Sequence, residues 1–130
     1  MARTPRILIT GDPTAYHVMS RTALDGYPLG DVEKDFFVSV IRRFSRIYFV
    51  EVLGFCLMGN HFHLLVRMRP EADFSDKAVK KRYALLYGEE QAITDEQIPF
   101  YRNKWCNLSE FIREIKLRFT RFYNRRHGRR

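Results

Sequence analysis

The sequence predicts one α+β domain, a ferredoxin-like sandwich in which a small antiparallel sheet is covered on one face by helices. The order of the apolar patterns is strand, helix, hairpin, helix, helix. The chain has 130 residues, 45% of them hydrophobic, so it can bury a core without disulfides or structural metals. It has only two cysteines and no internal repeat, and we therefore expect residues 1–130 to form a single domain.

The first part of the chain is predicted to hold a strand, a loop and a helix. Residues 16–22 (YHVMSRT) have strand composition, and residues 25–30 (DGYPLG) have the Gly and Pro content of a loop. Asp31 is expected to be the N-cap of a helix that ends near Arg46. Apolar residues at helical spacing give this helix one broad buried face, made of Val32, Phe36, Phe37, Val40, Ile41 and Phe44.

A β-hairpin is predicted next. Residues 47–58 and 61–68 are rich in β-branched and aromatic side chains, and Gly59-Asn60 between them tolerates the positive φ of a tight turn. Side chains of a strand alternate between its two faces. We therefore expect Phe62, Leu64, Val66 and Met68 to point toward the core, and His61, His63, Leu65 and Arg67 to point away from it.

The last part of the chain is predicted to be helical. Residues 71–106 form a polar connection with a helix over Asp76 to Tyr87 and a loop around residues 94–99. Asn107 and Glu110 resemble a capping pair that opens a final helix. Its apolar stripe is Leu108, Phe111, Ile112, Ile115, Phe119 and Phe122, and its opposite face gathers Arg113, Arg121, Asn124 and Arg125.

The charge of the chain is concentrated near its C-terminus. The net charge is +8, and residues 107–130 carry eight Lys or Arg against two Glu, which gives +6. Such a segment favours a polyanionic partner, although a solvated helix face with a frayed tail is the alternative interpretation. The nucleic-acid-binding candidates are Arg113, Arg118, Arg121, Arg125 and Arg126.

Localisation follows from what the chain lacks. No apolar stretch approaches the roughly 20 residues needed to cross a bilayer, and the N-terminus has no signal-peptide pattern. We therefore expect a cytoplasmic protein that does not bind a membrane.

His61 and His63 are the candidate metal ligands. Side chains two positions apart on a strand lie about 7 Å from each other on one face, so two imidazoles can reach a common divalent ion. The alternative is a pair of surface histidines without a ligand. His17 and Arg21 could border the same site, or be ordinary sheet-surface residues. A zinc cluster of Cys56, His61, His63 and Cys106 matches no common structural zinc spacing.

Three segments resemble motifs of one family. Residues 57–66 (LMGNHFHLLV) resemble the "LMPNHVHLL" signature of the HUH single-tyrosine transposases, in particular the REP-associated tyrosine transposases and their insertion-sequence relatives. Residues 16–21 (YHVMSR) are similar to the opening strand "YHVxxR", and residues 118–129 (RFTRFYNRRHGR) to the helix "RYTRYFNRRHGR". The motifs occur in the family's order, and the resemblance covers the chain from about residue 14 to the end.

The resemblance implies a single-stranded DNA endonuclease and strand transferase that often acts at hairpin DNA. His61 and His63 would be the catalytic and metal-binding residues and would hold Mg²⁺ or Mn²⁺. A tyrosine hydroxyl would attack the phosphorus and leave a 5′-phosphotyrosyl link and a free 3′-hydroxyl. The expected partner is single-stranded or hairpin DNA, and homodimer formation is left open.

The sequence also departs from the family. The family's nucleophilic tyrosine lies in a "YIxxNP" motif downstream of the "RYTRYFNRRHGR" helix, and no such motif occurs here. Phe119 stands at one tyrosine of that helix motif, and Tyr123 is expected to be a packed aromatic. We therefore expect a chain without its catalytic tyrosine helix, which binds DNA and metal without cleavage. The alternative is a non-catalytic nucleic-acid-binding module on the same fold.

Overall fold

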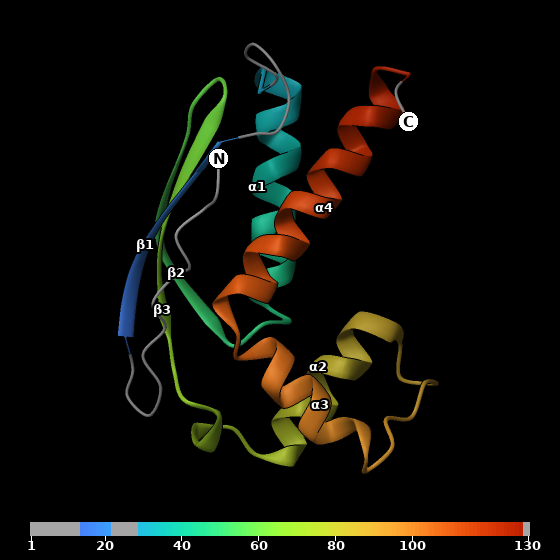
Figure 1. The fold of residues 1–130 in the computed structure, drawn as a ribbon. Helices are drawn as coiled ribbons and strands as arrows, with labels where there is room; N and C mark the ends of the chain where they lie inside the picture. Colours follow the sequence, from blue (N-terminus) through green and yellow to red (C-terminus); the bar gives the residue numbers. More distant parts are fainter. Residues whose placement is uncertain (1–13, 22–28, 129–130) are drawn as a thin grey trace, which may run out of the picture.

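The computed structural model describes residues 14–21 and 29–128. In this part of the chain, strands β1 (Thr14–Arg21), β2 (Val50–Leu57) and β3 (His61–Met68) form one antiparallel sheet. Helices α1 (Asp31–Ser45) and α4 (Leu108–Arg126) cover one face of it, and α2 (Asp76–Tyr87) and α3 (Gln97–Trp105) lie beyond one end (Figure 1). A short 3₁₀ helix, η1 (Glu71–Asp73), precedes α2. The predicted α+β sandwich is confirmed.

The strand order explains the ferredoxin-like character. The order is β1-β3-β2, and β3 pairs antiparallel with both neighbours. Strands β1 and β2 are therefore parallel to each other and are connected through α1, with β3 inserted between them. This is the split βαβ arrangement of ferredoxin-like folds. It makes β3, the strand that carries His61 and His63, the central strand of the described sheet.

Strand β2 begins three residues later than predicted. The backbone of residues 47–49 pairs with helices instead of with β3: the N–H of Tyr48 donates to Phe44 O, and the N–H of Phe49 donates to Trp105 O, both at 2.8 Å. The carbonyl of Tyr48 also accepts from Arg82 Nη1 at 2.8 Å. These buried residues form the turn out of α1, and the strand starts where pairing with β3 becomes available.

The turn between β2 and β3 also differs from the prediction. The hairpin forms, and the N–H of Met58 donates to the carbonyl of His61 at 2.9 Å. However, no described non-glycine residue has a positive φ, so Asn60 does not take the left-handed conformation expected of it. Its side chain contacts the His61 ring instead, as described below.

Two helix starts correct the sequence prediction. Helix α1 begins at Asp31 with Gly30 as N-cap, so Asp31 lies in the first turn, where its charge favours the helix dipole. Helix α3 begins at Gln97, inside the segment predicted as a loop. Pro99 is tolerated there because the first N–H groups of a helix have no intrahelical partner. Residues 25–28 of the other predicted loop lie outside the described residues.

Apolar residues of both layers form the core. The ring of Phe37 on α1 lies 4.9 Å from that of Phe62 on β3 and 5.3 Å from that of Phe119 on α4. Phe62, Leu64, Val66 and Met68 are buried, as predicted, and Val32 is exposed, contrary to the prediction. Among the described helices, none is long and apolar enough to cross a membrane.

Candidate functional site

His61 and His63 project from the sheet face that α1 and α4 do not cover. Phe62 between them is buried against Phe37, so alternation places both imidazoles on the other face, as the sequence predicts. Both side chains are half-buried, and their ring centroids are 5.2 Å apart with the rings edge to face. Pairing of β3 on both sides holds this spacing.

Asn60 selects one tautomer of His61. Asn60 Oδ1 lies 2.9 Å from His61 Nδ1. An amide oxygen can only accept a hydrogen bond, so Nδ1 of the neutral ring carries the proton in this arrangement. The lone pair of the ring is then on Nε2, where it can bind a metal ion.

His17 contacts His63 in a similar way. His17 Nε2 lies 3.0 Å from His63 Nδ1, and the two rings are nearly parallel with centroids 5.2 Å apart. When Nδ1 of His63 donates this bond, its Nε2 also keeps a lone pair. The structure thus brings His17 from β1 to the histidine pair. Arg21, the other residue singled out on this strand, is exposed and lies opposite His61 in the strand register.

The donor set around the pair consists of nitrogen atoms. Among the described residues, no group of three or more His, Cys, Asp or Glu side chains could hold a metal ion. Cys56 lies opposite His63 in the register, but Cys106 follows α3 and packs against the core. Burial is the main cause that raises the pKa of the Cys106 thiol to about 12. Two imidazoles, with no third His, Cys, Asp or Glu ligand beside them in the described part of the chain, fit an ion that completes its coordination with water or phosphate oxygens.

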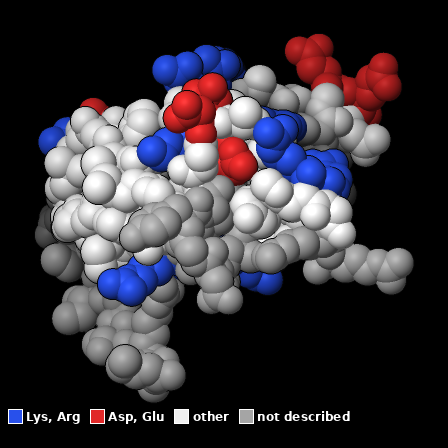
Figure 2. Space-filling model, turned by 90° about the horizontal axis from the view of Figure 1, so that it is seen from above, with Lys and Arg blue, Asp and Glu red and all other residues white. Residues whose placement is uncertain are grey.

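The five arginines predicted to bind nucleic acid do not lie in one cluster. Arg113 pairs with Glu110 at 3.7 Å, and Arg126 pairs with Glu33 at 3.8 Å. Arg118, Arg121 and Arg125 lie together along the side of α4 next to α1. Figure 2 accordingly shows Lys and Arg in separate groups, with acidic side chains between them.

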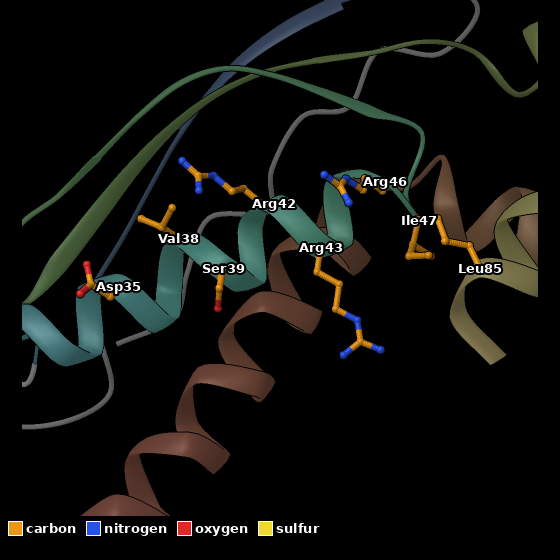
Figure 3. Close-up of a pocket in the computed structure, with 8 residues that line it drawn as sticks. All are labelled: Asp35, Val38, Ser39, Arg42, Arg43, Arg46, Ile47 and Leu85. Atoms are coloured by element: carbon orange, nitrogen blue, oxygen red, sulfur yellow. The ribbon is translucent and has the colours of Figure 1, made fainter. Parts of the chain in front are cut away.

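The three clustered arginines line a groove that sequence reasoning missed. This α1–α4 groove has a volume of about 610 Å³. Arg43 of α1 reaches toward α4, whereas Arg42 and Arg46 project from the other side of α1 (Figure 3). All three arginines line an adjacent hollow. For the α1 side of the groove, the sequence signal was the basic segment IRRFSR, residues 41–46, within a predicted helix. The groove is lined by Phe36, Ser39, Val40, Arg43, Phe44, Arg118, Arg121, Asn124 and Arg125.

Tyr123 is packed within the helical layer. Its ring lies 4.1 Å from that of His127 and 6.0 Å from that of Phe119. The sheet separates it from the face that carries His61 and His63.

Comparison with known proteins gives one match. The profile of a family described as "Transposase IS200 like" matches residues 13–107, which is more than two thirds of the chain. The matched range includes β1, α1 and the histidine pair and ends before α4. No curated protein and no solved structure gives a significant match.

Proposed function

The chain belongs to the family of IS200-like transposases, and from this premise we propose that it handles single-stranded or hairpin DNA with a divalent metal ion held by His61 and His63. The family places the chain among enzymes of DNA transposition. The observation that carries the finer proposal is the engaged Nδ1 atom of each imidazole. When Nδ1 of each ring donates its bond, both Nε2 atoms keep a lone pair on one face of β3.

The donor chemistry favours Mn²⁺ over Mg²⁺. Imidazole nitrogen is a better ligand for transition-metal ions than for Mg²⁺, which prefers oxygen and retains water. When bound, a divalent ion would supply Lewis acidity at the scissile phosphate. The histidines hold and orient it, while Asn60 and His17 fix the orientation of their rings.

The proposed reaction is a transesterification. A tyrosyl oxygen forms a bond to phosphorus while the bond to the 3′ oxygen breaks, so one ester link replaces another and no external energy is required. We assign this role to no described tyrosine. Tyr123 lies in the helical layer, and Tyr48 is buried, with a pKa raised chiefly by that burial.

Manganese titration tests the metal site. The double variant His61→Ala/His63→Ala should lose Mn²⁺ binding, because both nitrogen ligands are removed. His127→Ala is the matched control, since it removes a histidine at the end of α4. Equal Mn²⁺ affinity of the double variant and the wild type, measured by calorimetry, would refute the assignment.

A nuclease assay tests the assignment of the nucleophile. We expect this chain to bind a single-stranded substrate with Mn²⁺ without cutting it. A covalent protein–DNA adduct would show that a tyrosine of this chain attacks, and Tyr123→Phe would then be the first variant to examine. DNA binding that is indifferent to metal, with RNA competing equally, would instead support a non-catalytic nucleic-acid-binding module.

A further inference from the structure

We propose that the α1–α4 groove binds the phosphodiester backbone of DNA and contacts its phosphates but not its bases. This inference rests on the proposed DNA substrate and adds α1 to the elements that hold it. Helices α1 and α4 cover the inner face of the sheet, whereas His61 and His63 project from the outer face. The groove and the histidine pair therefore lie on opposite sides of the sheet.

The charge of the groove is one-sided. None of the described residues that line it is acidic, and four of them are arginines. Glu114 on α4 lies 3.3 Å from Arg118. Arg43, Arg121 and Arg125 form no ion pair with a described residue. A guanidinium presents a planar fork of donors that matches two phosphate oxygens, so this lining fits an anionic backbone.

The arrangement costs stability in the absence of an anion. Arg118, Arg121 and Arg125 are three and four positions apart, so they are neighbours on the surface of α4. Like charges at this spacing destabilise a helix. A bound chain of phosphates would relieve this repulsion, because Arg121 and Arg125 would gain a counter-charge such as Glu114 already gives Arg118.

The aromatic rings that line the groove already pack against other side chains of the protein. The ring of Phe36 stacks on that of Phe122 with centroids 3.8 Å apart. Phe44 is buried, and the guanidiniums of Arg43 and Arg118 lie 5.5 and 5.2 Å from its ring centroid. Sequence-tolerant base stacking requires an open aromatic face. Phe44 offers none, and Phe36 already stacks on Phe122. The groove therefore suits phosphates, and its contacts should carry no sequence information.

The double variant Arg121→Gln/Arg125→Gln tests the proposal. The matched control is Lys80→Gln/Lys81→Gln, which removes the same charge from exposed positions of α2. Binding of single-stranded and hairpin oligonucleotides of two unrelated sequences is measured over a range of salt concentrations, with chelator present. Because the chelator removes any metal from the histidine pair, the DNA affinity measured in this way depends on the groove and not on metal bound at the pair.

The expected result is a loss that does not depend on sequence. The groove variant should bind both oligonucleotides about tenfold more weakly, with a log–log salt slope smaller by about 1.4 for a single strand. Its melting temperature without DNA should change little, because the removed like-charge repulsion offsets the lost attraction between Arg125 and the C-terminal end of the α4 dipole. The lysine control should keep at least most of the affinity of the wild type.

Two results would overturn the proposal in different ways. If the wild type binds DNA and the groove variant binds equally well, the groove is not a DNA site although the proposed function stands. If the wild type binds neither oligonucleotide, the proposed DNA substrate itself is wrong. A groove variant that binds one sequence normally and the other weakly would show base recognition and would contradict a backbone site.

Discussion

At the level of single residues, His17 contacts one of the two proposed metal ligands. Its Nε2 lies 3.0 Å from Nδ1 of His63, where a hydrogen bond fixes the orientation of the His63 ring. Partners of this kind typically contribute a factor of 10–100 to metal affinity, although they do not touch the ion. His17 is exposed, so it can be replaced without opening the core.

Replacing His17 should weaken metal binding while the fold is retained. His17→Phe keeps an aromatic ring but removes the hydrogen bond, and we expect Mn²⁺ affinity to fall by about 10–100-fold. His17→Gln should restore part of the affinity, because an amide oxygen can accept from Nδ1–H of His63. Met19→Ala is the control, since Met19 is exposed and lies opposite His63 in the register. Calorimetry in which His17→Phe equals the wild type would contradict the role of His17.

The sequence predicts the histidine pair and His17 as a residue that could border it. The contacts that His17 and Asn60 make with the pair could not be predicted. Alternation within one strand places His61 and His63 together whatever the rest of the fold does. The contact of His17 with His63 spans 46 positions and depends on the register between β1 and β3, which local sequence does not determine. The side chain of Asn60 was missed because Gly-Asn at a hairpin suggests a backbone role.

At the level of elements, the cap of α4 stabilises the helix that supplies three of the four arginines of the groove. The side chain of Asn107 accepts a hydrogen bond from the backbone N–H of Glu110 at 3.1 Å. Asn107→Ala should lower the free energy of unfolding by about 1 kcal/mol, because this N–H loses its acceptor. Asn107→Gly should cost only a few tenths of a kcal/mol, since glycine is itself an accepted N-cap. Urea denaturation measures both variants, and equal stability of Asn107→Ala and the wild type would argue against the cap.

The elements differ in how far local sequence determines them. Helices α1, α2 and α4 and strand β3 follow from periodicity, because each buries one regular face. The start of β2 does not, because residues 47–49 have strand composition but bond to Phe44 and Trp105. The start of helix α3 was not predicted, because proline usually indicates a loop. Pro99 is compatible with a helix here because it lies in the first turn of α3. The groove depends on how α1 packs on α4, which their separate patterns do not specify.

For the molecule as a whole, the raised pKa values of two tyrosines predict that the protein becomes less stable at alkaline pH. Burial and a hydrogen bond with Tyr87 raise the pKa of Tyr101 to about 12, and burial is the main cause that raises the pKa of Tyr48. In the unfolded chain both ionise near pH 10. The unfolded state then loses protons that the native state retains, so the free energy of unfolding should fall as pH rises above about 10.

Urea denaturation over about pH 9–11 checks this expectation. The Tyr101→Phe variant should show a shallower fall than the wild type, because one of the ionisations linked to unfolding is removed. The Cys106 thiol, whose pKa is also raised, contributes to the fall in both proteins. A free energy of unfolding that is constant across this range would contradict the raised pKa values.

The position of β3 has a consequence for amide hydrogen exchange. Backbone amides of a strand paired on both sides exchange slowly, often only through global unfolding, whereas edge strands open locally at lower free energy. Within the described sheet, β1 and β2 are the edges, and His17 lies on β1. Local opening of β1 would therefore break the bond between His17 and His63 while His61 and His63 stay in register. Exchange data should show protection of residues 62–66 outlasting that of residues 16–20.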